Sequence, residues 1–144
     1  MKLMTIGEKG LALIKSFEGC KLKAYKCPAG VWTIGYGSTK GVTEGMVINE
    51  SMAEKLLIRD IEPCERALNK MGINFRQGQF DALVSFIFNC GEGNFNKSTL
   101  KKKIIAKADD KEIADEFKKW NKAGGKVLAG LVRRREAEAK LWME

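Results

Sequence analysis

The 144-residue sequence contains no histidine. This excludes a Ser-His-Asp triad, a Cys-His protease and any zinc site built on imidazole ligands. No apolar run approaches the roughly 20 residues that a membrane-spanning helix needs, and the first residues lack the apolar stretch of a signal peptide. We therefore expect no membrane anchor. If the chain is an enzyme, carboxyl, thiol or hydroxyl groups must carry its chemistry.

The four cysteines are too few for a disulfide scaffold in a chain of this length, and no CxxC spacing indicates zinc. Cys64 and Cys90 lie inside helical patterns, so we expect them to be small buried apolar residues. Cys20 and Cys27 lie seven positions apart in a segment rich in glycine and aromatic residues. They are close enough in sequence to pair if the chain folds back.

The balance of charge is basic, with 26 lysines and arginines against 18 acids and a net charge of +8. A basic surface favours a polyanionic partner such as nucleic acid, an acidic membrane face or a cell wall, although solubility alone explains it equally well. No groove-reading motif and no RNA-binding signature is present, so we do not expect nucleic acid as the partner.

The first part of the chain alternates between helical and strand-forming patterns. A capping box at Thr5 predicts a helix that ends near Gly19. Residues 23–42 are rich in aromatic residues and glycine, which predicts a small antiparallel hairpin or three-stranded sheet. A second capping box at Ser51 predicts a helix that runs to about Asn69.

The rest of the chain is helical in pattern. An almost wholly apolar segment predicts a buried helix that ends at Cys90, and a glycine pair precedes the last helix. The candidate caps of the intervening helices are Ser98, Asp109 and Asp110. We predict one mainly helical α+β domain over residues 1–144. A small sheet lobe would cover about 19–50, a helical lobe 51–144 plus the first helix, with a ligand cleft between them.

Glu18 stands at the predicted end of the first helix, directly before the sheet. A carboxylic acid at the edge of a cleft can serve as a general acid. Glu18 is nevertheless one of 18 acids, and the pattern alone favours an ordinary surface glutamate over a catalytic one.

Three segments together resemble the phage-type lysozymes of glycoside hydrolase family 24. The first runs from Phe17 to Gly37 and holds Glu18, eight residues, Cys27, five residues and Thr33; in the family this spacing joins Glu, Asp and Thr. The second is the apolar helix 80–91, followed by Ser98-Thr99-Leu100. The third covers 120–138. The matches occur in the order of the family and span nearly the whole chain.

The resemblance implies a lysozyme-like fold and hydrolysis of the β-1,4 bond between N-acetylmuramic acid and N-acetylglucosamine in peptidoglycan. Glu18 would protonate the leaving oxygen, and Thr33 would position water on the opposite face of the sugar. The resemblance implies no metal and no cofactor. Trp32 can be a core residue or a platform for a sugar ring. Tyr36 and Asn89 would support the cleft, and Arg134 or Arg135 would pair with Glu18.

Cys27 departs from the aspartate of the family. A free thiol has a pKa near 8.5, so little of it is ionised at neutral pH. Cys27 can be the working base or nucleophile, can merely pack beside Thr33, or can be an introduced residue. The cysteines also resemble a subgroup of secreted phage lysozymes that thiols regulate, which implies a Cys20–Cys27 disulfide that an external reductant would open.

We expect a monomeric endolysin that stays in the host cytoplasm until lysis and acts on the wall in the periplasm. A separate holin-type protein would release it. Two alternatives remain open. A lytic transglycosylase would cut the same bond but leave an anhydro-sugar, and a non-enzymatic cationic protein that binds membranes or the wall would keep its effect without Glu18.

Overall fold

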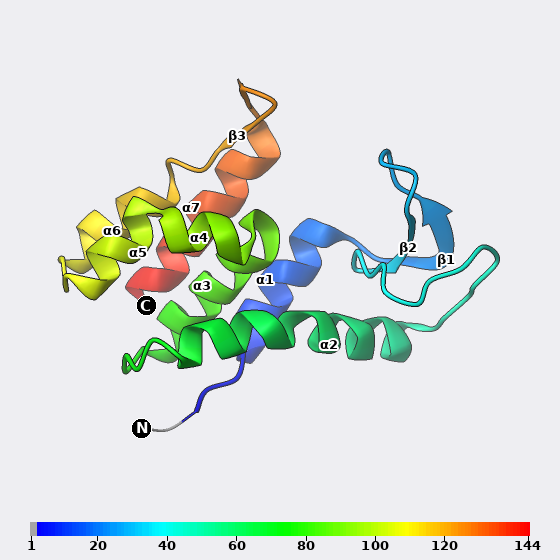
Figure 1. The fold of residues 1–144 in the computed structure, drawn as a ribbon, viewed down its shortest axis with the longest axis horizontal. Helices are drawn as coiled ribbons and strands as arrows, with labels where there is room; N and C mark the ends of the chain where they lie inside the picture. Colours follow the sequence, from blue (N-terminus) through cyan, green and yellow to red (C-terminus); the bar gives the residue numbers. More distant parts are fainter. Residues whose placement is uncertain (1–2) are drawn as a thin grey trace. The chain divides into compact units, whose positions relative to one another are not determined.

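The computed structural model describes residues 3–144, and their fold is the predicted mainly helical one with a small antiparallel sheet (Figure 1). The chain divides into two compact units. One unit comprises residues 1–13 and 64–144, and the other residues 14–63. The second unit is longer at each end than the segment 19–50 that the sequence indicates, because the ends of two helices belong to it.

The sheet unit contains the end of α1 (Glu8–Glu18), the hairpin of β1 (Lys21–Lys26) and β2 (Trp32–Gly35), and the start of α2 (Glu50–Asn69). β1 and β2 are antiparallel, with Tyr25 opposite Thr33. Residues 46–48 run beside β1, where Ala24 N–H donates to the Met46 carbonyl at 2.9 Å. The Cβ of Ala53 lies 3.4 Å from the position that a Cβ on Gly35 would take, so the end of β2 packs on α2.

The helical unit is built around α3 (Gln77–Cys90), which is buried along most of its length and packs against α7 (Ala129–Met143). α4 (Glu92–Lys97), α5 (Thr99–Ile105) and α6 (Asp110–Phe117) follow in the chain and surround this pair (Figure 1). The Phe86 ring lies edge-on to Phe117, 5.7 Å away between centroids, at the centre of this core. Such aromatic pairs stabilise a core beyond the area that they bury.

Several predicted helix ends are confirmed, and two capping boxes are wrong. Ser98 Oγ accepts from Lys101 N–H, and Asp109 caps α6 in the same way. α2 begins one residue before Ser51, and its cap is Asn49, whose Oδ1 accepts from Met52 N–H at 2.8 Å. Asparagine is as good a cap as serine, so residue type alone did not select between the two.

A short hairpin precedes α7, where the sequence analysis expected only a break. β3 (Lys122–Ala123) and β4 (Lys126–Val127) are joined by Gly124 and Gly125, which have φ values of +58° and +79°. Two residues with positive φ form the tight turn that matches the twist of paired strands. The glycine pair in the sequence therefore indicated a hairpin, which the sequence analysis did not predict.

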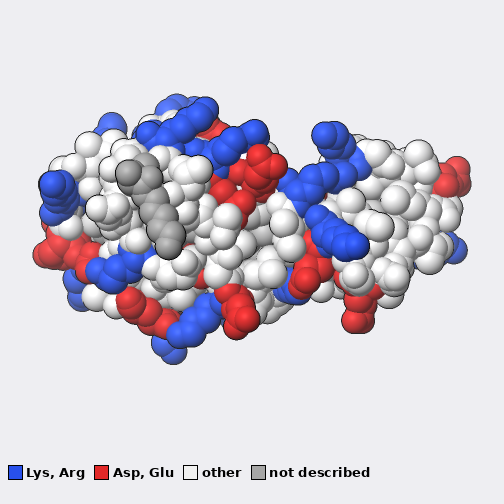
Figure 2. All heavy atoms as spheres, turned by 90° about the horizontal axis from the view of Figure 1, so that it is seen from below, with Lys and Arg blue, Asp and Glu red and all other residues white. Residues whose placement is uncertain are grey.

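The charged side chains on the face in Figure 2 are mixed, with lysines and arginines lying among acids. This face offers no uninterrupted basic surface of the kind that tracks a nucleic acid backbone. In residues 3–144, no helix combines the length and the apolar character needed to cross a membrane.

The N-terminus of α1 is capped by Asp81 of α3, and not by Thr5. The Asp81 carboxylate accepts from Gly7 N–H at 2.9 Å and from Gly10 N–H at 3.2 Å. The two helices approach closely here, because a Cβ on Gly10 would lie 2.6 Å from the Asp81 Cβ. A distant acid therefore satisfies donors that a local cap usually satisfies.

Replacing Asp81 with alanine is expected to lower the free energy of unfolding by about 2–3 kcal/mol, since buried N–H groups lose their acceptor. Urea denaturation followed by circular dichroism measures the change. The control is Asp115→Ala, which removes an exposed acid and should change stability by less than about 0.5 kcal/mol. Equal effects of the two substitutions would contradict this role of Asp81.

Candidate active site

Glu18 is the last residue of α1 and is half-buried. Its carboxylate lies beside the loop that follows β2, because a Cβ on Gly37 would stand 3.6 Å from Glu18 Oε1. Gly37 has a φ of +93°, in the region that favours glycine. The end of α1 and the loop after β2 therefore meet at this carboxylate, within the unit that also holds Cys27 and Thr33.

Cys27 opens the turn that joins β1 to β2. Its N–H donates to the Val31 carbonyl at 3.0 Å, and its carbonyl accepts from Gly30 N–H at 2.8 Å. Hydrogen bonding from the backbone of Val31 and Ala29, within this turn, holds the pKa of the Cys27 thiol below its ordinary value. Hydrogen bonds to the charged form stabilise it, so this turn favours a thiolate.

Thr33 is 5% exposed and lies in β2, directly after the turn. Its hydroxyl donates to the Val31 carbonyl at 3.0 Å. The same hydroxyl is within reach of the Cys27 sulfur, where it also lowers the thiol pKa. A hydroxyl has one proton and two lone pairs. Thr33 can therefore donate to one of these groups at a time and keeps an acceptor for water.

Trp32 and Tyr36 both lie near lysines in the sheet unit. Trp32 is only partly buried and not a core residue, and the ammonium of Lys26 lies 5.5 Å from its ring centroid. The ammonium of Lys15 lies 5.8 Å from the ring centroid of Tyr36. Burial and the hydrogen-bonded neighbour Cys20 raise the pKa of the Tyr36 hydroxyl. Roles for the two rings in holding substrate stay predictions.

All four cysteines are free thiols. Cys20 is exposed and precedes β1, whereas Cys27 follows it, so the six-residue strand lies between them. An extended strand of this length separates its flanking residues by roughly 20 Å. The Cα atoms of a disulfide lie roughly 4–7 Å apart. The predicted disulfide would therefore require β1 to leave its place in the hairpin.

The three arginines of α7 do not form a solvated face. Arg133 is exposed, but Arg134 and Arg135 are 4% and 0% exposed. Glu138, also fully buried, lies 2.8 Å from Arg135 Nε and accepts from Ser85 Oγ at 2.5 Å. Arg134 Nε also donates to Ser85 Oγ at 3.3 Å. The i,i+3 and i,i+4 spacing of Glu138 from the arginines was the signal that the sequence analysis missed.

Asn89 is exposed at the end of α3, and its Oδ1 accepts from Arg135 Nη2 at 2.7 Å. Cys90 is only partly buried, and its sulfur accepts from Arg135 Nη1. Cys64 is buried as predicted, and burial raises the pKa of its thiol to about 11. Cys90 is thus a polar partner of a buried arginine and not a small apolar residue. The predicted pairing of an arginine with Glu18 stays a prediction.

The described residues contain no group of three or more Cys, Asp or Glu side chains that could hold a metal ion. The sheet unit contains the carboxyl, thiol and hydroxyl groups that the sequence analysis selected, at Glu18, Cys27 and Thr33. An acid together with an ionisable nucleophile or base is suited to hydrolysis of an acetal bond.

Two endolysins resemble this chain along its length. The endolysin of Acyrthosiphon pisum secondary endosymbiont phage 1 is 45% identical over 144 residues and is covered to 98% of its length. The endolysin of Bacillus phage B103 is also 45% identical, with 97% of this chain aligned. The chain spans only 54% of the length of that second relative.

Solved structures of phage endolysins and of a muramidase domain also resemble this chain along nearly its whole length. The muramidase domain of SpmX from Asticaccaulis excentricus is 37% identical with a TM-score of 0.89, and the match covers 97% of this chain and 98% of that one. The active form of P1 phage endolysin Lyz gives a TM-score of 0.86, and its secreted inactive form gives 0.63, each at 29% identity and over 96% of this chain. The match covers 84% of the active form's chain and 96% of the inactive form's.

The sequence model described as Phage lysozyme matches residues 15–138, a range that contains Glu18, Cys27, Thr33 and the buried arginines. The matched range takes in the sheet unit almost entirely and most of the helical unit. This chain therefore belongs to the phage lysozyme family.

Proposed function

We propose that this chain is a muramidase of the endolysin type, which hydrolyses the β-1,4 bond between N-acetylmuramic acid and N-acetylglucosamine in peptidoglycan. Its family, its endolysin relatives and the muramidase domain that resembles it support this proposal. The observation that carries it is the match of the Phage lysozyme model to residues 15–138, a range in which Glu18, Cys27 and Thr33 keep the spacing of the family's Glu, Asp and Thr.

In the proposed reaction Glu18 donates its proton to the glycosidic oxygen as the bond to the anomeric carbon breaks. Thr33, whose hydroxyl already donates to the Val31 carbonyl, accepts a hydrogen bond from the attacking water. The Cys27 thiolate serves the same face, as the base that takes the proton of this water or as the nucleophile. The chain thereby belongs to a subgroup with Cys in place of Asp.

The products test this proposal. Purified peptidoglycan is digested and the fragments are analysed by mass spectrometry after borohydride reduction. A muramidase leaves reducing N-acetylmuramic acid ends, each of which gains two hydrogen atoms. Fragments that end in anhydro-sugar would instead establish a lytic transglycosylase. An unchanged wall in the presence of reductant would leave only a non-enzymatic binding protein.

We further propose that the protein acts in host-cell lysis, as its relatives' names indicate. It would stay in the host cytoplasm as a monomer until lysis. A holin-type protein would then permeabilise the membrane and let it reach the wall. Expression inside bacteria with and without such a membrane-permeabilising protein tests this route. Lysis only in its presence is the expected outcome, and lysis without it would contradict the route.

Oxidation that joins Cys20 to Cys27 is expected to abolish activity, since it consumes the thiolate and displaces β1. Mild oxidant followed by peptide mapping identifies the disulfide, and dithiothreitol should restore full activity. The control is Cys20→Ser, which cannot form this bond and should keep its activity in oxidant. Retained activity in a mapped Cys20–Cys27 disulfide would contradict the role of Cys27.

A further inference from the structure

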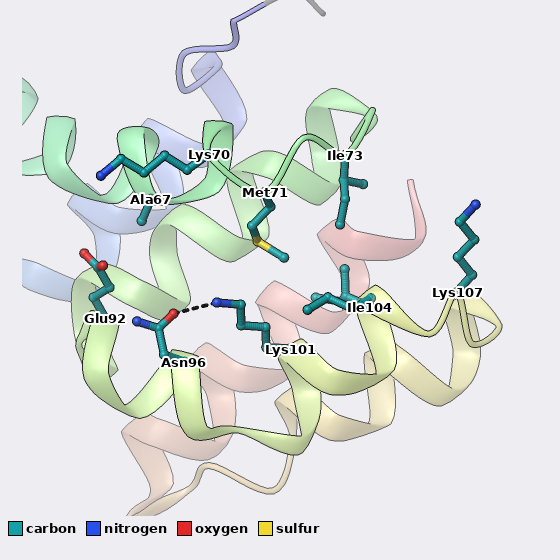
Figure 3. A pocket seen from close by; sticks show the side chains of 10 residues that line it. Ala67, Lys70, Met71, Ile73, Glu92, Asn96, Lys101, Ile104 and Lys107 are labelled. Atoms are coloured by element: carbon teal, nitrogen blue, oxygen red, sulfur yellow. Dashed lines mark hydrogen bonds between the residues drawn. The ribbon is translucent and has the colours of Figure 1, made fainter.

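The helical unit contains a cavity that none of the candidate catalytic residues lines. It has a volume of about 510 Å³ and lies between the end of α2, the segment that follows it, and α4 and α5 (Figure 3). Cavities of this size hold small organic ligands or a few residues of a peptide. All of its lining residues belong to one compact unit, so its shape is fixed by that unit alone.

The middle of the cavity is apolar. Met71, Ile73 and Ile104 point toward its centre in Figure 3, from the segment after α2 and from α5. Ile105 also lines it and is 59% exposed. Exposed apolar side chains gathered around a hollow are typical of a ligand site.

Two lysines lie at opposite ends of the apolar middle of the cavity, Lys70 directly after α2 and Lys107 after α5 (Figure 3). Within residues 3–144 neither ammonium has a carboxylate within 4 Å. Lys101, in contrast, donates to Asn96 Oδ1 at 2.8 Å across the cavity wall. The two outer lysines are therefore available to anionic groups of a ligand.

The backbone of Lys107 adds a second, independent observation. Its φ is +59°, and among the described residues it is the only one besides glycines with a positive φ. It occupies the position after α5 where Lys107 N–H donates to the Ile104 carbonyl and Ala108 N–H to the Lys103 carbonyl. Glycine is the favoured residue at such a helix end. Residues other than glycine that are held in this backbone region cluster at ligand sites, where their side chain has a use.

We propose that this cavity binds the peptide stem of peptidoglycan, a proposal that rests on the proposed function. The stem is a short peptide with carboxylates, small methyl side chains and one free amine. Its carboxylates would meet Lys70 and Lys107, its methyl groups would cover Met71 and Ile104, and its amine would meet Glu92, the acid of the lining. Lysines at both ends of the cavity fit a peptide with two separate carboxylates better than a lipid, which carries its charge at one end.

Calorimetric titration of the full chain tests the proposal. The probe is the sugar-free stem pentapeptide N-acetyl-alanyl-γ-D-glutamyl-lysyl-D-alanyl-D-alanine, in which the acetyl group replaces the amide link to the sugar and leaves one free amine. The same peptide with both free α-carboxyl groups amidated should bind at least about tenfold more weakly, because its charges are removed. Vesicles of phosphatidylglycerol are the competing ligand. Absent peptide binding, equal binding of the amidated peptide, or lysine-dependent binding of the vesicles alone would overturn the proposal.

Variants locate the site. The double substitution Lys70→Gln with Lys107→Gln should weaken binding about tenfold or more, whereas Lys102→Gln, an exposed lysine of α5 outside the cavity, should change it less than about twofold. Lys107→Gly should weaken binding while raising the urea midpoint, because it removes both the charge and the strained φ. Unchanged binding in the double variant would place the peptide elsewhere and overturn the proposal.

The two proposals fail separately. If the pentapeptide does not bind but the protein still releases reducing ends from peptidoglycan, only the peptide site is wrong. If the pentapeptide binds through Lys70 and Lys107 but no glycan bond is cut, the proposed function is wrong and the peptide site stands. The double variant should cleave peptide-free glycan strands at the parent rate and intact peptidoglycan with a raised KM.

Discussion

Replacing Glu18 with glutamine is expected to lower the release of reducing ends from purified peptidoglycan by about 10³-fold, the middle of the range of about 10²- to 10⁴-fold that general acid catalysis contributes. The amide keeps the shape of the side chain but cannot give a proton to the glycosidic oxygen. The leaving oxygen would then depart as an unprotonated alkoxide, which is a poor leaving group. Reducing ends counted against time give the rate directly.

The matched control is Glu44→Gln, which changes an exposed glutamate of the same unit. It should keep activity within about twofold, as is usual for surface substitutions. Thermal unfolding of both variants shows whether either has lost its fold. A folded Glu18→Gln protein with parental activity would remove Glu18 from the mechanism.

Replacing Cys27 with serine is expected to lower the same rate by about 10²- to 10³-fold. Hydrogen bonding from the backbone of Val31 and Ala29 holds the pKa of this thiol below its ordinary value. A serine hydroxyl in the same turn stays protonated at neutral pH and cannot replace the thiolate. Hydrolysis assays with Cys20→Ser as the control isolate the effect, because Cys20 is an exposed thiol outside this turn.

Cys27→Asp should retain substantial activity, because a carboxylate is ionised at neutral pH without help from the turn. The reaction needs a proton on Glu18 and none at position 27 at the same time. A carboxyl loses its proton at lower pH than a thiol, so more of the aspartate variant than of the parent meets both conditions at acidic pH. The activity of the aspartate variant relative to the parent should therefore rise as the pH falls from about 7 to about 5. A Cys27→Ser variant as active as the parent would contradict a role for the thiolate. It would mean that Thr33 and the water that it positions are sufficient for the attack on the sugar.

Much of the fold follows from local signals. The end of α1 at Glu18, the end of α2 at Asn69 and the cap of α5 at Ser98 agree with the predictions, because helix ends depend on nearby residues. The cap of α1 does not, because Asp81 supplies it from 71 to 74 positions away. No local pattern contains such a partner.

The candidate site, like the fold, could be predicted from the sequence only in part. The spacing of the family motif was enough to select Glu18, Cys27 and Thr33. The hydrogen bonds that lower the pKa of the Cys27 thiol come mainly from the backbone, so the residue types do not reveal them. The buried pairing of Arg135 with Glu138 was also missed. Arginines normally face water, and only the packing of α7 against α3 places these side chains inside.

The central claim is that a thiolate at Cys27 serves the reaction. Its most direct test alkylates Cys27 with iodoacetamide at about pH 7, below the ordinary pKa of a thiol, in protein that carries Cys20→Ser. Mass spectrometry gives the alkylated fraction of Cys27 against time, and the release of reducing ends from peptidoglycan gives the remaining activity. The account predicts that Cys27 reacts at this pH and that activity is lost in proportion to its alkylation. Parental hydrolysis by protein with fully alkylated Cys27 would contradict it.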